Sequence, residues 1–494
     1  MNFRQIPSNI RVPGSYVEID AREAFGGLSS SAKRALIISQ MLSTGTAEAL
    51  KPTMVTGYAQ ALTLFGVGSL AGEMAEALFA NDEFIEKWFI CAEDPAGGVK
   101  AKASGAIVAS GTPSESGSIY LYINGVRLVI PVSTANALDE IWVAVAAAVN
   151  EQTELAVTAA YVSNTNTITF TAKHAGVIGN KIDVRLNWLG EENGEKLPAG
   201  MTTNVSKVVM ASGAGEVDLT DVLAGLPDEK FDVIVLPYND ATSMGLISDE
   251  LEARWDALRA VDGFFLTAKK GTVSALSSFG NDYNSPYGAV LDAGKDNPTP
   301  EYLWAAALAG RVIASVNNDP SLPFTGLELK GVIADKPENR RTISERNILL
   351  YDGISTHRVA RDGSVQIERL ITLYQLNEAG APDPAYLDAN TPFTLSYLRE
   401  TLNNRILTRF AQFKLADKLV PGAGNIVTPN IIRAELIDLA NQWAKEGQVE
   451  NIDQFKRDLV VERNANDRTR VDVKLPPDLV NQFYIFAASI MFRI

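Results

Sequence analysis

The sequence has few of the residue types from which most catalytic and metal sites are built. It contains one cysteine, Cys91, and two histidines, His174 and His357, in 494 residues. One cysteine excludes an internal disulfide framework and is typical of a chain that folds in a reducing compartment. The two histidines fall in different predicted domains, which excludes a His/Cys zinc site. Neither lies beside a nucleophile signature, so we interpret His357 as a half-buried strand residue and Cys91 as a small buried hydrophobe.

Positive charge and long apolar runs are also scarce. The chain has 44 Lys and Arg residues against 59 Asp and Glu residues, which gives a net charge of −15. This balance argues against wrapping nucleic acid or lying on an anionic membrane. No window approaches the run of about 20 apolar residues that spans a bilayer, and the first residues lack the apolar core of a signal peptide. We expect a soluble protein that is made in the cytoplasm and contacts neither nucleic acid nor membrane.

Short sequence motifs that mark ligand-binding sites are also absent. The chain has no G-x-G-x-x-G, no G-x-x-x-x-G-K-[ST] and no G-x-S-x-G motif. These motifs mark dinucleotide sites, phosphate-binding loops and hydrolase nucleophiles. We therefore predict no cofactor, no metal site and no catalytic residues.

The composition itself is that of an ordinary globular protein, with 46% hydrophobic and 21% charged residues. A chain of this length is expected to form two to four domains. Arg34 to Gln40 predicts a short buried strand, and Ser69 predicts the N-cap of a helix that ends near Ala80. From about Pro95 the composition shifts towards Gly, Ala and Ser.

A small inserted domain is predicted over residues 97–205. The Asn124-Gly125 pair lies between alternating apolar residues, which is a strong β-hairpin signal. A helix over 137–149 and a second hairpin over 155–172 complete a compact α+β pattern. The second hairpin is rich in hydroxyl and Asn side chains, so we expect it to face solvent.

Short apolar runs alternate with helical patterns from residue 216 onward, beginning with FDVIVLPYND at 231–240. This alternation predicts a mostly parallel sheet with flanking helices, that is, an α/β core. Asn239 and Asp240 follow the first core strand, where ligands bind in such sheets. Strands are expected at 263–267, 287–291, 347–354, 357–360 and 365–374, and helices at 243–260, 272–279, 299–316, 395–419, 429–445 and 452–461.

Both ends of the chain resemble strands without an obvious partner. Ser15 to Asp20 alternates at period two, and Val471 to Ile494 carries apolar residues to the last position. An apolar strand left unpaired in water is an aggregation site. Each segment either pairs within its own domain or adds to a sheet of another copy. The residues alone leave both interpretations open.

Basic residues recur in the predicted helix after Pro392 of this acidic protein. Two pairs, 405–409 and 414–418, are spaced to share a helix face. The helix is either an ordinary solvated surface or a docking element for an acidic partner, with an attraction that salt would weaken. The residues concerned are Arg399, Arg405, Arg409, Lys414 and Lys418.

Over its full length the chain resembles the contractile tail sheath proteins of myophages, particularly the Mu-like branch. The resemblance is carried by an ordered set of segments rather than by one sharp signature. These are RVPGSYVEI, RALIIS, PTMVTGYAQALTLFGVGS, the insert with its Asn-Gly hairpin, DVIVLPYND, FTLSYLRETLNNRILTRF and FYIFAASIMFRI.

The resemblance implies a fold and an assembly. The α/β core is expected to have a subtilisin-like topology without protease activity, because the histidine arrangement of a protease is missing. Subunits of the family form hexameric rings stacked helically around a tail tube, with a baseplate and a tail terminator as further partners, and contraction drives the tube through the host envelope for genome delivery. The implied organisation is an N-terminal arm (1–28), a joining α/β segment (29–96), an outer insert (97–205), the core (216–375), an inner-facing helical part (376–481) and a C-terminal arm (482–494).

Residue roles follow from the same resemblance. The inter-subunit strands are expected at 9–20 and 482–494, through Val12, Tyr16, Val17, Ile19, Phe483, Ile485, Ile490 and Phe492. Hinges are expected at Pro13, Gly14, Gly26, Gly27, Pro476 and Pro477, and the five basic residues are candidates for contact with the tube. Two other functions stay open: an α/β hydrolase, and a static strand-exchanged coat or surface-array protein.

Overall fold

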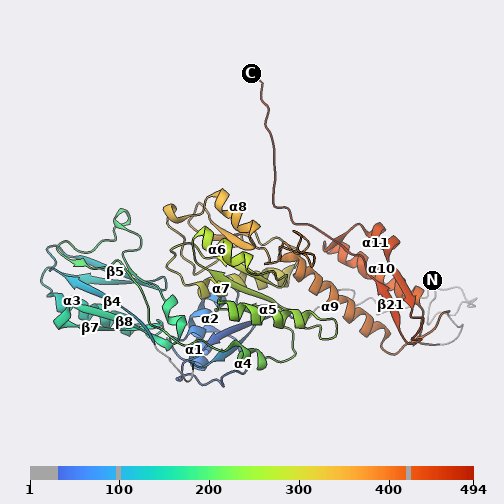
Figure 1. The fold of residues 1–494 in the computed structure, drawn as a ribbon, viewed down its shortest axis with the longest axis horizontal. Coiled ribbons are helices and arrows are strands. Elements are labelled where there is room, and N and C mark those ends of the chain that lie inside the picture. Colours follow the sequence, from blue (N-terminus) through green and yellow to red (C-terminus); the bar gives the residue numbers. More distant parts are fainter. Residues whose placement is uncertain (1–31, 96–101, 419–423, 494) are drawn as a thin grey trace, which may run out of the picture. The chain divides into compact units, whose positions relative to one another are not determined.

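The computed structural model describes residues 32–95, 102–418 and 424–493 (Figure 1). The described residues divide into two compact units. The larger unit comprises residues 32–396 and 479–493, and the smaller comprises 397–478.

An eight-stranded sheet forms the centre of the larger unit, in the order β16-β15-β14-β13-β12-β1-β3-β2. Neighbours from β3 to β15 are parallel, and only the edge strands β2 and β16 run antiparallel. The strands are β1 (Arg34–Gln40), β2 (Thr53–Val55), β3 (Glu86–Ala92), β12 (Val233–Val235), β13 (Phe264–Lys269), β14 (Gly288–Asp292), β15 (Ile354–Val359) and β16 (Val365–Arg369).

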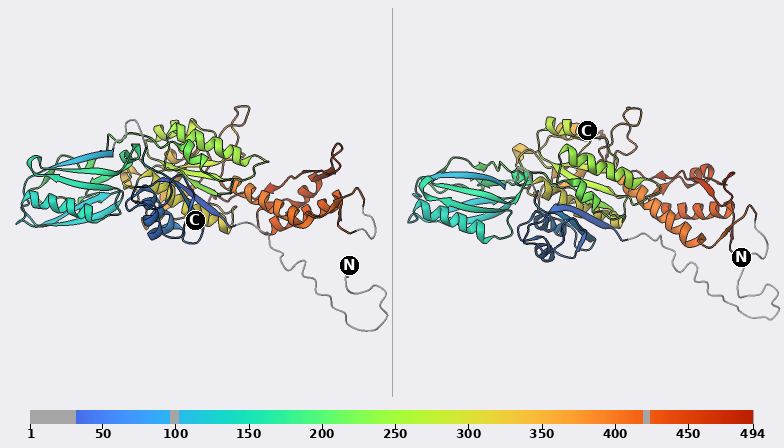
Figure 2. Two further views of the ribbon diagram at one scale, coloured as in Figure 1. Left: turned by 90° about the horizontal axis from the view of Figure 1, so that it is seen from below. Right: turned by 60° about the horizontal axis from the view of Figure 1, so that its bottom comes forward.

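Helices cover both faces of this sheet. Helix α7 packs against α2 and against strands β1, β12 and β13, whereas α5 and α6 lie on the opposite face (Figure 2). Strands β1, β12, β13 and β14 are fully buried along most of their length, as expected for parallel strands covered on both sides. The helices are α1 (Tyr58–Phe65), α2 (Leu70–Asn81), α4 (Leu219–Ala224), α5 (Ala241–Trp255), α6 (Val273–Asn281), α7 (Glu301–Asn318) and α8 (Ile343–Tyr351).

The insert between β3 and β12 has two four-stranded sheets and its own hydrophobic core around Trp142 and Phe170. Asn124 and Gly125 both have positive φ angles, 51° and 90°, which is the geometry that an Asn-Gly hairpin turn requires. One sheet has the order β10-β4-β8-β7 and the other β11-β9-β5-β6. The elements are β4 (Lys102–Ser110), β5 (Gly117–Ile123), β6 (Val126–Val132), α3 (Leu138–Glu151), β7 (Val157–Val162), β8 (Thr167–Ala175), β9 (Val184–Leu186), β10 (Thr202–Thr203) and β11 (Lys207–Val208).

The smaller unit is mainly helical. Trp443 is fully buried in it and donates a hydrogen bond of 2.9 Å to the hydroxyl of Thr401. Its elements are the greater part of α9 (Asn390–Phe410), with α10 (Pro429–Lys445), α11 (Ile452–Asp458), β17 (Lys414–Leu415), β18 (Ile426–Val427), β19 (Val449–Glu450), β20 (Val460–Arg463), β21 (Val471–Lys474) and β22 (Asp478–Leu479). Strands β20 and β21 form an antiparallel pair.

Most predicted elements are confirmed, including the mostly parallel α/β core. Ser69 caps α2 by accepting a hydrogen bond from the backbone N–H of Gly72. Helix α10 spans the range expected for it, and Gly363 turns the β15–β16 hairpin with a φ angle of 90°. The domain boundaries drawn from the sequence stay predictions.

Two predictions were wrong, and the expected pairing of the C-terminal run with another copy stays a prediction. Residues 347–354, expected as a strand, mostly belong to helix α8, because Thr342 and Glu345 form a capping box that starts a helix at Ile343. The helix expected over 395–419 begins earlier and ends at Phe410, so Lys414 lies in β17 and Lys418 in a loop. Beyond β22 the last apolar run has no regular structure in the described residues.

Candidate functional site

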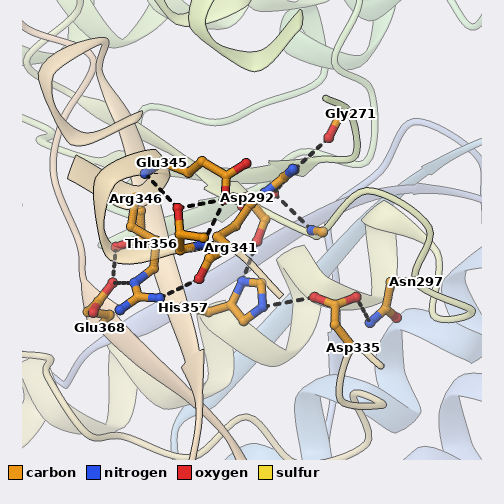
Figure 3. Close-up of polar contacts among 12 residues, drawn as sticks. Gly271, Asp292, Asn297, Asp335, Arg341, Glu345, Arg346, Thr356, His357 and Glu368 are labelled. Atoms are coloured by element: carbon orange, nitrogen blue, oxygen red, sulfur yellow. Dashed lines mark hydrogen bonds and ion pairs between the residues drawn. The ribbon is translucent and has the colours of Figure 1, made fainter. Parts of the chain in front are cut away.

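A buried polar network occupies the carboxyl edge of the sheet, where α/β proteins usually bind ligands (Figure 3). In β15, Nδ1 of His357 lies 2.8 Å from the carbonyl oxygen of Asp292 and Nε2 lies 3.2 Å from the carboxylate of Asp335. Burial alone would lower the pKa of His357, but the carboxylates of Asp335 and Asp292 outweigh it and raise that pKa. Because each ring nitrogen already faces an acceptor, His357 is not placed to take a proton from a nucleophile.

The same network joins this edge to helix α8. Arg341 contacts both carboxylate oxygens of Asp292, at 3.0 and 3.2 Å. Arg346, one turn further on, pairs with Glu368 of β16 at 2.8 Å. These are buried or half-buried pairs between neighbouring elements, so the network holds the sheet edge together (Figure 3).

His174, the second histidine, also has a structural position. Its Nε2 accepts a hydrogen bond of 2.9 Å from the backbone N–H of Leu70, at the start of α2. Its Nδ1 lies 2.6 Å from the carboxylate of Asp94. His174 therefore joins β8 of the insert to the core, and its acceptor nitrogen is already occupied.

The switch point of the sheet, between β1 and β12, is filled by side chains. Lys181 of the insert pairs with Glu301 at 2.9 Å and donates to the amide oxygen of Asn239, while Asp240 caps helix α5. Cys91 is buried, and burial raises the pKa of its thiol well above the ordinary value. A cavity beside Glu73 and His174 measures about 10 Å³, about enough for one water molecule.

The C-terminal arm presents a different kind of surface. From Ile485 to Arg493 every residue is exposed. The arm exposes 76% of Phe483, 79% of Ile485, 90% of Ile490 and 80% of Phe492. No strand partner is found for them among the residues that the structure describes. Concentrated exposure of large apolar side chains marks an interaction site.

Two residues at the base of the arm contact the larger unit. Gln482 donates a hydrogen bond of 3.0 Å to the carbonyl oxygen of Ser321. The guanidinium of Arg369 lies over the ring of Tyr484, 4.5 Å from its centroid. The sequence analysis missed this contact, because Arg369 and Tyr484 lie far apart in the chain and the run from Gln482 onward is apolar almost throughout.

The five basic residues that are candidates for contact with the tube differ in their ion pairs and exposure. Arg405 pairs with Glu435 and Asp438 of α10, at 2.9 and 3.3 Å, and Arg409 pairs with Glu435 at 2.9 Å. Lys414 and Lys418 are exposed and lie beyond the helix, so the five residues do not share one helical face. Arg399 lies in α9, half-buried.

Most of the remaining predicted arm and hinge residues lie outside the residues that the structure describes. Val12, Tyr16, Val17, Ile19 and the joints Pro13, Gly14, Gly26 and Gly27 lie outside the described residues. Pro476 and Pro477 lie between β21 and β22. Within the described ranges, no group of three His, Cys, Asp or Glu residues could hold a metal ion, and none of the helices is long and apolar enough to cross a membrane.

Comparisons with known proteins point in one direction. Residues 212–373 match the model of the phage tail sheath protein central domain, and residues 381–493 match that of the phage tail sheath C-terminal domain. The Mu-like prophage FluMu tail sheath protein of Haemophilus influenzae is 35% identical over 495 residues, which cover 100% of this chain and 99% of that protein.

Solved structures give a likeness in fold. The sheath tail protein from Desulfitobacterium hafniense superposes with a TM-score of 0.51 at 12% identity, over 95% of this chain and 97% of that one. A sheath tail protein from Listeria innocua superposes with a TM-score of 0.49 at 15% identity, over 92% of this chain and 93% of that one.

Proposed function

The chain belongs to the phage tail sheath family, and from that premise we propose that it is the repeating subunit of a contractile sheath. Copies polymerise around a tail tube, and shortening of the sheath drives the tube through the host envelope. The observation that carries the proposal is the C-terminal arm, because its exposed apolar residues need a partner that the described part of the same chain does not supply.

The partner that fits this arm is a sheet of a second copy. In an extended strand, Phe486, Ile490 and Phe492 fall on one face, and Ile485 and Met491 fall on the other. A strand that is apolar on both faces is typical of one covered on both sides. Each backbone hydrogen bond contributes only about 0.5–1.5 kcal/mol net, but several in one strand hold two copies together while other contacts change.

The assembly follows from the family. We propose hexameric rings stacked helically, with the tail tube, baseplate and tail terminator proteins as partners, in the tail sheath of a virion that is assembled in the host cytoplasm. The N-terminal arm is proposed as a second link between copies, with Gly and Pro joints as hinges. The energy for contraction is stored in packing and released once, so no nucleotide is required.

We propose a structural rather than a catalytic role. Both histidines are committed to buried contacts, and insert side chains fill the switch point of the sheet. The core is further proposed to have a subtilisin-like topology, as the resemblance to the family implies. Sustained turnover of a peptide substrate by the purified protein would contradict the structural role.

Electron microscopy of the purified chain tests the proposal. We expect negatively stained tubes from the full chain, and folded monomers without tubes after deletion of residues 482–494. Circular dichroism of the truncated chain serves as the folding control. Flat lattices or closed shells from the full chain would contradict a sheath, and tubes from the truncated chain would show that the C-terminal arm is not the link.

A further inference from the structure

The C-terminal arm begins with residues that are docked on the body of the protein. Gln482 and Tyr484 are half-buried, whereas Phe483 and every described residue from Ile485 onward are exposed. The two inward side chains are spaced by two, as in an extended strand with one face against the body of the protein. The docked part of the arm therefore ends at Tyr484.

The surface that receives Tyr484 is rigid. Arg369, the last residue of β16, is held by two hydrogen bonds to Asp388, at 2.9 and 3.0 Å, and its guanidinium carbon lies 4.5 Å from the centroid of the phenol ring. Asn390 is fully buried and donates to the carbonyl oxygens of Pro320 and Leu322, at 2.9 and 2.8 Å. Its side-chain oxygen lies 3.5 Å from the hydroxyl of Tyr484.

The contact between Arg369 and Tyr484 is suited to hold the arm in place. A guanidinium over an aromatic ring is attracted by the ring's negative face, and the contact strengthens when both groups leave water. Burial, followed by the negative charge of Asp388, raises the pKa of Tyr484 well above its ordinary value. The phenol therefore stays neutral at any physiological pH, and the clamp does not depend on pH.

We propose that Gln482 and Tyr484 clamp the arm to its own subunit, so that only the residues after Tyr484 are exchanged between copies. This inference rests on the proposed sheath function, because it assumes that the arm joins two copies. The ten residues from Ile485 to Ile494 can span at most about 33–36 Å when fully extended. The acceptor strand of the next copy must then begin within that distance of Tyr484. The clamp would replace Pro476 and Pro477 as the origin of the arm.

Limited proteolysis of the monomer fraction with chymotrypsin tests the clamp directly. We expect rapid cleavage after Phe486 and Phe492 and slow cleavage after Tyr484, because a docked segment cannot enter a protease site. Arg369→Gln should raise the rate of cleavage after Tyr484 about tenfold, a factor within the strength of a partly buried cation–π contact. Arg358→Gln, at an exposed arginine of β15, is the control and should leave that rate unchanged. Equal rates after Tyr484 and Phe486 in the unaltered chain would overturn the proposal.

Assembly experiments distinguish a failure of the clamp from a failure of the proposed sheath function. Tyr484→Phe keeps the ring and should build regular tubes, whereas Tyr484→Leu should build few or irregular tubes with an unchanged melting temperature. Deletion of residues 485–494 should build none. Tubes from the deletion variant would refute the exchanged arm itself. If the deletion abolishes tubes while Tyr484→Leu leaves their number and helical order unchanged, only the clamp is refuted.

Discussion

Asn124, in the hairpin turn of the insert, donates a hydrogen bond of 3.0 Å to the half-buried carboxylate of Glu73 in α2. The hydroxyl of Tyr302 in α7 donates a second one, of 2.9 Å. Burial, with a smaller contribution from the charge of Glu76, raises the pKa of Glu73 to about 7, against the lowering effect of these two donors and of Lys173. Burial of this carboxyl group therefore costs least when it is protonated, although both hydrogen bonds favour its charged form.

We predict that burial of Glu73 makes the folded protein less stable as the pH rises. Folded Glu73 binds its proton more tightly than the unfolded chain does, so stability is lost between pH values of about 4.5 and about 7, by about 3 kcal/mol at most. Glu73→Gln cannot ionise and should remove this dependence. The measurement is the apparent free energy of unfolding at pH 5 and pH 8. Glu48→Gln, at an exposed carboxylate, is the control, and a pH dependence that survives in Glu73→Gln would contradict the prediction.

The buried pair of His357 and Asp335 should depend on pH in the same direction, for a different reason. The folded pKa of His357 is raised above 6.5, so the stability from its charged form is complete below that pH and is lost as the pH rises through the folded value. Asp335→Asn should cost about 3–5 kcal/mol at pH 5.5, the range for breaking a buried ion pair. At pH 9 the cost should be smaller. Chemical denaturation at the two pH values measures it, with the exposed Asp249→Asn as control; equal costs at both would exclude a charged His357.

Single charges in the arm should block polymerisation without unfolding the subunit. Ile490 is 90% exposed, so Ile490→Asp leaves the monomer's core unchanged but puts a carboxylate into an apolar strand interface. We expect an unchanged melting temperature and no fast-sedimenting polymer. Leu258→Asp, at a 97% exposed loop residue, is the matched control and should polymerise normally. A polymer of normal length from Ile490→Asp would argue against burial of the arm.

Substitution of the basic residues should have two different effects, a loss of stability for some and a loss of tube binding for others. Arg405 pairs with Glu435 and Asp438, so Arg405→Gln should lower the stability of the smaller unit by about 1–3 kcal/mol. Lys414 and Lys418 are exposed, so changing both to Glu should leave stability unchanged and reduce co-sedimentation with purified tail tube. Added salt should weaken binding of the unaltered chain. Undiminished, salt-independent binding of the double variant would remove these lysines from the tube-contact candidates.

Local signals in the sequence located many of the elements correctly. The Asn124-Gly125 turn, the Ser69 cap and helix α10 could be predicted because each depends on a few neighbouring residues. Helix α8 was missed because its apolar run resembles a strand, and the decisive signal was the Thr342–Glu345 capping box upstream of it. Helix α9 was extended too far because two lysines with helical spacing follow its true end at Phe410.

By itself, the amino-acid sequence determined that this protein has an α/β core, an insert with β-hairpins and an apolar last segment, because periodicity, turn residues and composition act over short stretches. Only the tertiary structure decided that Arg405 is paired with α10, that His357 is held between Asp292 and Asp335, and that Tyr484 rests on Arg369. These contacts join residues far apart in the chain, and side-chain partners across such distances depend on how whole elements pack.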